Sequence, residues 1–232
     1  MANGRFLVTW LILVCAPTIV RAGRPMVTDD TQTAGQGECQ IEFWSDRLGA
    51  VRSQSLSPAC GLTDELELDA GVSRIQGGAS TLSSAALGLK WAPAFLVYQV
   101  AFGTLSLGVK AGNAWARDTA LRWRNDGPAL IGLASLALGS SLTIDLNLGA
   151  VRSDFAGSTA TTLNLGAAWQ PDERWLFFGE VLGTDHDRPA GQAGFRWWLV
   201  PGTLGLDCGV GYAPMSRATL SLGLGWYRIR LP

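Results

Sequence analysis

Apolar and polar side chains alternate along most of the chain, beginning near residue 39. In the clearest stretch, from Leu142 to Gly149, leucine or isoleucine fills every second position, and threonine, aspartate, asparagine or glycine lies between them. The stretches 65–72 and 220–226 repeat this pattern. A period of two is typical of β-strands, because successive side chains of a strand point to opposite faces. The pattern therefore predicts strands with one apolar and one polar face.

Clusters of Gly, Pro, Asp and Ser divide the alternating region into segments of about ten residues, a length that crosses a membrane when the strand is tilted. The predicted strands lie near residues 39–47, 50–58, 63–74, 81–91, 98–112, 128–138, 141–152, 158–169, 174–185, 190–200, 203–213 and 217–229. The sequence thus predicts an all-β fold, a single antiparallel transmembrane β-barrel of about 12 strands, within a range of about 10–12.

The connections between these segments alternate in length. Residues 138–141, 171–174 and 200–203 are short enough for tight turns, whereas 113–127 and 184–191 indicate longer polar loops. Bacterial barrels have short periplasmic turns and longer extracellular loops, so we assign the tight turns to the periplasm. The alternation is weakest over 91–103, where we expect a bulge or a register shift.

The polar face of the predicted strands carries many Gly and Ser residues but few charges. A soluble barrel directs its apolar face inward and covers its outside with charged residues. In a membrane barrel the apolar face contacts lipid and the polar face lines the lumen. The second arrangement fits this chain better than a soluble, lipocalin-like barrel.

The beginning of the chain indicates export to the cell outer membrane. Arg5 precedes an apolar stretch too short for a comfortable membrane-spanning helix, and Val20-Arg21-Ala22 offers a cleavage site, so residues 1–22 are predicted to be a signal peptide. Residues 23–38 are expected to form a periplasmic N-terminal segment that caps the periplasmic mouth or tucks into the lumen. Residues 39–232 would form the outer-membrane β-barrel as one domain.

Composition narrows the set of partners. The net charge of -1 and the low fraction of charged residues argue against a nucleic-acid partner. We expect contacts with outer-membrane lipids and the barrel-assembly machinery, and a small-molecule cargo that the sequence does not identify.

Three cysteines remain after signal-peptide cleavage, in a compartment that permits disulfides. If the first two strands turn at Leu48-Gly49-Ala50-Val51, Cys39 and Cys60 are equally far from the turn and face each other. A disulfide there would contribute roughly 3 kcal/mol by constraining the unfolded chain. The alternative is two buried free thiols. Cys208 falls on the apolar face and is expected to act as a small hydrophobic residue.

The same counting from the predicted turns places five polar residues of the inward face at one height of the barrel. It pairs neighbours in order along a lumen polar belt made of Asn147, Asn164, Glu180, Arg196 and Asp207. In the same way, a turn around Gly77-Gly78 sets Glu65 opposite Lys90, which predicts an ion pair in the lumen.

Two interpretations of this belt remain open. A polar network can simply join the strands of the wall, because a buried Arg can satisfy two carboxylates. Alternatively, the belt sets the width and ion preference of a pore. The predicted lumen holds more acidic than basic side chains, so a conducting pore would show mild cation selectivity.

Short motifs along nearly the whole mature chain resemble a proteobacterial outer-membrane family. They are Arg24-Pro25-Met26-Val27-Thr28-Asp29-Asp30, Cys39-Gln40-Ile41-Glu42, Pro58-Ala59-Cys60, Leu146-Asn147-Leu148-Gly149, Gly179-Glu180-Val181 and Gly194-Phe195-Arg196-Trp197-Trp198-Leu199-Val200-Pro201. The family they resemble is named for the MetA (meta-cleavage) pathway of phenol degradation. The resemblance implies an outer-membrane barrel described as a transporter.

Chemistry other than transport has little support. The single His186 lies between Asp185 and Asp187 on a predicted surface loop, which could mimic a catalytic pair but is also typical of a solvated turn. Asp29 and Asp30 are adjacent on an extended segment and point apart, so we expect neither a metal site nor a cofactor. We predict a channel or passive transporter for small solutes, hydrophobic or aromatic ones included, and not an enzyme. The alternatives are a closed structural or interaction barrel and, with less support, a barrel hydrolase.

Overall fold

The computed structural model describes residues 26–78, 80–117, 122–212 and 218–230, so the predicted signal peptide lies outside the described residues. The strands are β1 (Glu38–Leu48), β2 (Val51–Gly61), β3 (Leu66–Gly77), β4 (Ser80–Trp91), β5 (Val97–Val100), β6 (Gly103–Arg117), β7 (Arg124–Leu138), β8 (Leu142–Ser153), β9 (Ser158–Trp169), β10 (Trp175–Thr184), β11 (Ala190–Val200), β12 (Leu204–Tyr212) and β13 (Thr219–Arg230). A short 3-10 helix, η1 (Ala94–Leu96), precedes β5. In the part of the chain that the structure describes, no helix is long and apolar enough to cross a membrane.

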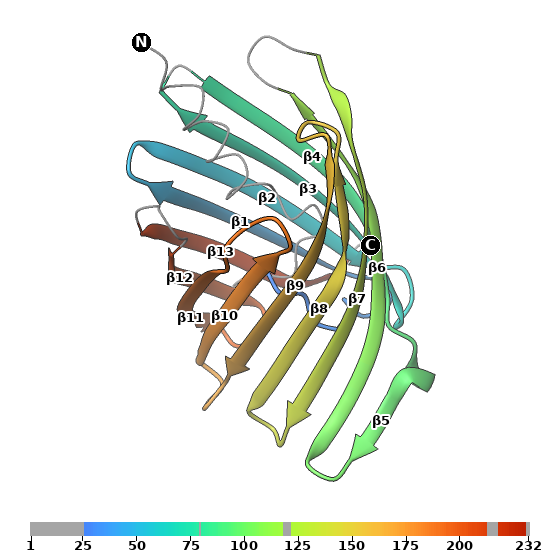
Figure 1. Ribbon diagram of the computed structural model, residues 1–232. Helices are drawn as coiled ribbons and strands as arrows, with labels where there is room; N and C mark the ends of the chain where they lie inside the picture. The colour runs from blue at the N-terminus through green and yellow to red at the C-terminus, as the bar shows by residue number, and fades with distance from the viewer. Residues whose placement is uncertain (1–25, 79, 118–121, 213–217, 231–232) are drawn as a thin grey trace.

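Twelve antiparallel strands close into a barrel, as the sequence predicts (Figure 1). Neighbours in sequence pair with one another, apart from β4 and β5, and β1 pairs with β13. The ring closes between β4 and β6, because β5 pairs only with β6 and extends outside the closed wall. Residues 91–103, where the alternation of apolar and polar residues is weakest, therefore contain η1 and β5, which together form the connection between β4 and β6.

Because of the alternation along the strands, apolar side chains cover the outside of the barrel and polar side chains face its interior, the reverse of a soluble protein. On β13, Leu220 and Leu222 are 61% and 65% exposed on the outside, while Ser221 between them is 8% exposed. The same contrast recurs around the wall, where leucine, valine and tryptophan face outward and carboxylates, lysines and amides are buried. An apolar exterior of this extent is compatible with lipid and not with water.

Aromatic side chains gather near the turn between β9 and β10. Trp175 stacks on Phe177 and on Trp197, with ring centroids 6.2 Å apart in both pairs, and Trp169 lies 5.7 Å from Phe177. Aromatic girdles of this kind lie at the membrane–water interface of outer-membrane barrels. The cluster thus indicates one edge of the membrane-spanning band.

The first hairpin confirms the predicted register and the predicted disulfide. Leu48 pairs with Val51 across the turn, and Cys39 pairs with Cys60 at the open end. Their sulfur atoms form a disulfide. Cys208 is a free cysteine, as expected.

One predicted loop is mostly strand. The sequence indicated a polar loop over 113–127, but β6 continues to Arg117 and β7 begins at Arg124. Of the residues that suggested a loop, Arg117 lies on β6 and Arg124 and Gly127 lie on β7. The register of the two strands shifts between Ala114 and Trp115, where Asp126 beside Gly127 is the extra residue of a bulge. Gly127 has a φ of 123°, which explains the glycine at this irregular position.

Candidate lumen site

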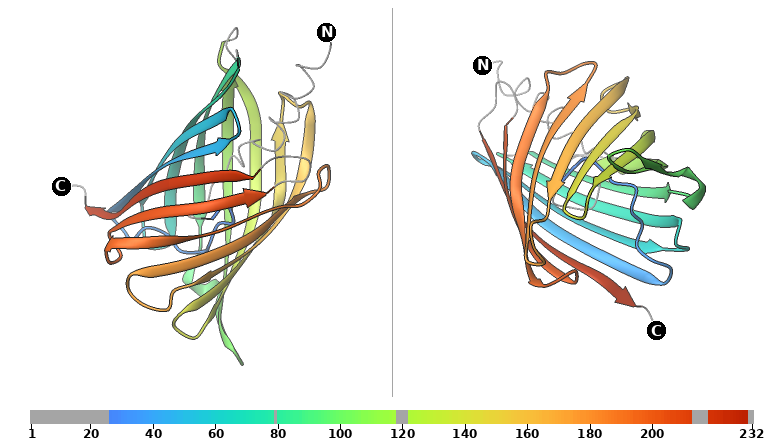
Figure 2. Two further views of the ribbon diagram at one scale, coloured as in Figure 1. Left: turned by 90° about the vertical axis from the view of Figure 1, so that its left-hand side faces the viewer. Right: turned by 90° about the horizontal axis from the view of Figure 1, so that it is seen from below.

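The segment Met26–Gln36, which precedes β1, runs inside the ring of strands (Figure 2). At one end Gln36 forms a parallel bridge with Gly61 of β2, and at the other Thr28 bonds Glu180 of β10. Strands β2 and β10 lie on opposite sides of the ring. The segment therefore crosses the lumen from wall to wall. Of the two placements that the sequence left open, the structure has the one in which the segment tucks into the lumen.

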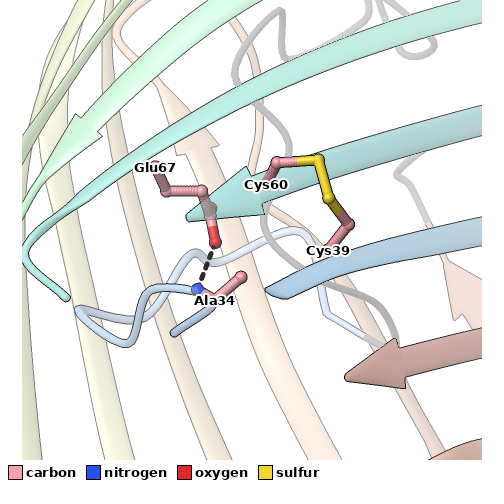
Figure 3. The surroundings of a disulfide bond; sticks show 4 residues. All are labelled: Ala34, Cys39, Cys60 and Glu67. Atoms are coloured by element: carbon pink, nitrogen blue, oxygen red, sulfur yellow. Dashed lines mark hydrogen bonds between the residues drawn. A yellow bond between two sulfur atoms is a disulfide. The ribbon is translucent and has the colours of Figure 1, made fainter. Parts of the chain in front are cut away.

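At the rim, the base of the segment is held close to the disulfide. The Ala34 amide donates to Glu67 Oε2 at 2.7 Å, beside Cys39 and Cys60 (Figure 3). The Gly37 amide donates to the Gly61 carbonyl at 3.0 Å. A Cβ atom on Gly61 would lie only 1.9 Å from the carbonyl oxygen of Ala34, so a glycine is required where the segment meets β2.

At the centre, the Asp29 carboxylate lies between two lysines. Lys90 Nζ of β4 is 3.2 Å from Asp29 Oδ1, and Lys110 Nζ of β6 is 2.9 Å from Asp29 Oδ2. Glu67 lies 3.2 Å from Lys90, and Asp69 lies 3.3 Å from Lys110. All five side chains are buried. We call Asp29, Glu67, Asp69, Lys90 and Lys110 the segment cluster.

The ionisation state of Asp29 follows from this cluster. Burial by itself raises the pKa of the carboxyl group, but the charges of Lys110 and Lys90 and their hydrogen bonds outweigh burial and hold the pKa below its usual value. Asp29 is therefore the charged partner of both lysines at neutral pH, and each contact is a charge-assisted hydrogen bond.

Two wall side chains bind the backbone of the segment beside Asp29. The Asp29 amide donates to Asn147 Oδ1, and Asn147 Nδ2 donates to the Asp29 carbonyl, both at 2.7 Å. The Thr31 amide donates to Ser135 Oγ at 2.9 Å, and Ser135 donates to Asp145. Asn147 thus acts as a neighbouring strand would, by satisfying both the N–H and the C=O of one residue.

Glu180 binds the far end of the segment. Its two carboxylate oxygens accept from the Val27 and Thr28 amides, each at 2.7 Å, and one of them also accepts from the Thr28 hydroxyl. Gln192 of β11 donates to the same carboxylate. Glu180 is 5% exposed, so these donors compensate a buried charge.

A second charged cluster lies wholly on strands. Arg196 Nε and Nη2 donate to Asp207 at 2.6 and 2.8 Å, a bidentate pair between β11 and β12. Arg196 Nη2 is also 3.8 Å from Glu42 of β1, which accepts a hydrogen bond from the Tyr227 hydroxyl of β13. The guanidinium carbon lies 4.7 Å from the Tyr227 ring centroid. We call Glu42, Arg196, Asp207 and Tyr227 the wall cluster.

All five residues of the predicted belt are buried in the lumen wall. Asn147 pairs with Asn164, and Arg196 pairs with Asp207, as the sequence predicts. The other two predicted pairs are wrong. Asn164 is opposite Leu182, and Glu180 is opposite Gly166 on one side and Gln192 on the other. The five residues therefore divide between the segment's binding site and the wall cluster.

Turn geometry explains these register errors. Between β10 and β11, the Thr184 hydroxyl accepts from the His186 and Asp187 amides, and this turn leaves Ala190 opposite Leu182. Between β9 and β10, the turn is centred one residue later than predicted, because Asp172 accepts from the Arg174 and Trp175 amides. When the centre of a turn moves by one residue, each residue's partner on the next strand changes by two. An even shift keeps every side chain on the same face, so the inward assignment holds while the partners change.

The predicted ion pair between Glu65 and Lys90 is also wrong. Gly77 pairs with Ser80, which centres the turn one residue later than predicted and sets Glu67 opposite Lys90. Glu65 instead accepts from the Ala94 amide at 2.9 Å, in the connection that contains η1. The positive φ of Gly78 (59°) is typical of the tight hairpin turn that causes this shift.

Sequence reasoning missed the partner of both lysines. Asp29 lies in a segment without strand periodicity, so no register argument reaches it. One signal was available: Lys90 and Lys110 are the only lysines in the sequence, and both fall on the inward face of predicted strands. The other basic residues, apart from His186, are all arginines.

His186 occupies an exposed loop between β10 and β11. Its Nε2 atom lies 3.1 Å from the Thr159 carbonyl and 3.7 Å from Asp185 Oδ1. Asp185 in turn accepts from the Thr161 amide at 2.9 Å. These contacts join the loop to the beginning of β9.

Solved structures of porins share this architecture. The KdgM porin aligns with a TM-score of 0.59 at 10% sequence identity, over 81% of this chain and 98% of that one. The KdgM porin in complex with disordered oligogalacturonate gives 0.61 at 8% identity, with the same coverage. The NanC porin gives 0.51 at 9% identity, over 83% of this chain and 100% of that one. At such identities the likeness shows the fold alone.

No significant match is found among curated proteins. The comparisons do not confirm the resemblance to the phenol meta-cleavage family, which stays a prediction. One family model matches residues 10–220 and is described as "Uncharacterised conserved protein UCP029691". Because the match spans most of the sequence, the chain belongs to this family of uncharacterised conserved proteins.

Proposed function

We propose that the protein is an outer-membrane channel or passive transporter for small solutes, and that Met26–Gln36 is the plug of its closed state. The observation that carries this proposal is the buried Asp29 carboxylate of a segment that crosses the lumen, held between Lys90 and Lys110 of the neighbouring wall strands β4 and β6. A segment that crosses the lumen obstructs passage. The contacts that hold it there are polar or ionic, so water can replace them when it leaves.

The lining of the lumen supports hydrophilic solutes. The buried side chains of the wall are mostly polar or charged, although they include Trp44, Phe178 and Trp198. Most of the large apolar side chains face outward, where we propose that they contact membrane lipids. Hydrophobic or aromatic solutes, which the sequence left open, would gain little from such a wall. A small hydrated solute fits this chemistry better.

The wall charges favour cations once the plug has left. Six buried carboxylates (Glu42, Glu67, Asp69, Asp145, Glu180 and Asp207) face the lumen against three buried cations (Lys90, Lys110 and Arg196). An excess of one sign in a narrow pore enriches the opposite sign among permeating ions. We expect mild cation selectivity, and a reversal potential of the opposite sign under a salt gradient would contradict it.

Planar bilayer recordings on the full chain test the channel proposal. Asp29→Asn removes the charge that the lysines bind, so we expect a higher open probability than in the wild type. Gly61→Ala offers a second route, because its Cβ collides with the base of the plug without a change in charge. Gly71→Ala is the matched control, since a Cβ there meets nothing within 4 Å.

The outcome decides between a channel and a closed barrel. If Asp29→Asn and Gly61→Ala insert but conduct no more than the wild type and Gly71→Ala, the channel proposal fails. The protein would then be a closed structural barrel in which the segment is a permanent part of the interior.

A further inference from the structure

We propose that the lumen site now occupied by Val27–Asp29 is a binding site for short extended peptides with an acidic side chain, for which the plug is the resident competitor. This inference deepens the proposed function and rests on it for the role of the site in transport. The binding itself is tested without reference to conduction.

The site recognises groups that every peptide carries. Glu180 accepts from two consecutive backbone amides, those of Val27 and Thr28. Asn147 pairs with both the amide and the carbonyl of Asp29. Few of these contacts depend on which side chains the peptide carries. Another peptide in the same extended conformation can therefore supply the same backbone N–H donors and C=O acceptor.

The site recognises one side chain of its occupant, the carboxylate of Asp29, through the charges of two lysines. Lys90 and Lys110 come from different strands and bind the two oxygens of one carboxylate at 3.2 and 2.9 Å. Each lysine also has a wall carboxylate of its own, Glu67 for Lys90 and Asp69 for Lys110. The lysines therefore keep partners when the occupant leaves, so the site can exchange one carboxylate for another without an unpaired buried charge.

The acidic surroundings select against simple anions. Glu67 and Asp69 contact the two lysines and repel a free dicarboxylate, whereas Glu180, which binds the two preceding residues, attracts N–H donors. A suitable ligand must present backbone N–H groups one and two residues before its carboxylate-bearing residue, as Val27 and Thr28 do for Asp29. A proline at either position lacks that N–H group and would leave Glu180 short of one donor.

Competition with the tethered plug sets the affinity range. A segment attached to the barrel by a short linker has an effective concentration in the mM range, so a free peptide displaces it only when present at comparable levels or when the plug is weakened. Weak, exchangeable binding is also what a passive transporter requires, because a solute must leave the site after entering it.

The two lysines offer a direct readout. They are the only lysines in the sequence, so acetylation detected by mass spectrometry at Lys90 and Lys110 reports occupancy of this site alone. The experiment uses the full-length Asp29→Asn variant in detergent, in which the plug lacks its carboxylate. The probe is acetyl-Val-Thr-Asp-Ala-amide, compared with the same peptide containing Asn for Asp, with the same peptide containing Pro for Val, and with succinate.

We expect the Asp peptide to protect both lysines at a concentration about tenfold lower than the Asn peptide, which corresponds to one charge-assisted contact. The Pro peptide should also be about tenfold weaker, since it loses one N–H donor to Glu180. Gly61→Ala, which keeps Asp29, serves as a second host if Asp29→Asn does not fold, with a smaller separation expected.

Three results would overturn the proposal. Equal protection by the Asp and Asn peptides would show that the lysines do not read a carboxylate. Equal protection by succinate and the Asp peptide would show an anion site without peptide recognition. No protection by any peptide in either host would show that the site accepts only its own segment. If the bilayer recordings show no conductance but peptides protect the lysines from acetylation, the channel proposal fails and the binding-site proposal stands.

Discussion

The two charged clusters inside this barrel differ in where their partners come from. In the wall cluster, Glu42, Arg196, Asp207 and Tyr227 all lie on strands, and they join β1, β11, β12 and β13. In the segment cluster, the wall supplies both lysines and two carboxylates, but Asp29 comes from a segment outside the strands. Both clusters are buried and ionic, yet only one can lose a member without breaking the wall.

Their positions explain the difference in role. The wall cluster spans the seam where the first and last strands meet, and its ion pairs hold elements that are far apart in sequence. The segment cluster binds a crossing element that, among the described residues, forms no ladder with any strand apart from the bridge of Gln36 to Gly61. We therefore expect the same kind of substitution to unfold the barrel in one cluster and to release the plug in the other.

The largest effect is expected for Arg196→Met. The substitution leaves Asp207 and Glu42 without their buried cation, which typically costs about 3–5 kcal/mol of unfolding free energy. Urea unfolding followed by tryptophan fluorescence measures the loss. Arg196→Met combined with Asp207→Asn should recover a large part of it, and a double variant no more stable than the single one would contradict the assignment. Lys90 and Lys110 should stay protected from acetylation in the folded fraction.

Loss of the disulfide should cause the second-largest decrease in unfolding free energy. Replacing Cys39 and Cys60 by serine removes a constraint on the unfolded chain, and the chain-entropy model gives a loss of roughly 3 kcal/mol in unfolding free energy. Because the hairpin turn is tight, we expect the measured loss to be no larger than this. The plug should remain docked, because the hydrogen bonds and ion pairs described for it above are made by nitrogen and oxygen atoms and not by the sulfur atoms of Cys39 and Cys60. Asp-N cleavage before Asp29, which we expect the buried segment to resist, measures docking independently of stability. Rapid cleavage in the serine variant would show that the disulfide also holds the plug.

Lys110→Met should weaken the barrel less and affect the plug more. The variant removes one of two cations from Asp29, a charge-assisted contact worth about 2 kcal/mol, and Asp29 can then leave for water. We expect faster Asp-N cleavage, faster acetylation of Lys90 and a smaller loss of stability than in Arg196→Met. Lys110→Gln with Asp69→Asn controls for the wall carboxylate left behind. If Lys110→Met destabilised the barrel as much as Arg196→Met and kept the plug docked, the two clusters would not differ as proposed.

The sequence predicts one cluster better than the other for a physical reason. Alternation determines which face each residue takes, so Arg196, Asp207 and Glu180 could be assigned to the lumen from the sequence alone. Register counting then found the Arg196–Asp207 and Cys39–Cys60 pairs, whose turns are tight. It failed for Glu180, because the Asp172 and Thr184 side chains reshape the turns on either side of β10. It failed for Glu65, because the tight turn at Gly78 is centred one residue later than predicted. Asp29 could not be placed by either method, since its segment has no period and its partners are brought together only by closure of the barrel.

Tyr227→Phe should give the smallest effect and the sharpest test of how the wall cluster is built. The Tyr227 hydroxyl donates to Glu42, and its ring packs 4.7 Å from the Arg196 guanidinium carbon. Phenylalanine keeps the ring and removes the hydrogen bond to Glu42, which is worth about 1.5–3 kcal/mol because its acceptor is charged. We expect a value near the lower end, since Arg196 still compensates Glu42. A loss as large as that of Arg196→Met would mean that Glu42 depends on the hydroxyl and not on the guanidinium. The seam between β1 and β13 would then be held by a hydrogen bond between the two strands and not by the cation on β11.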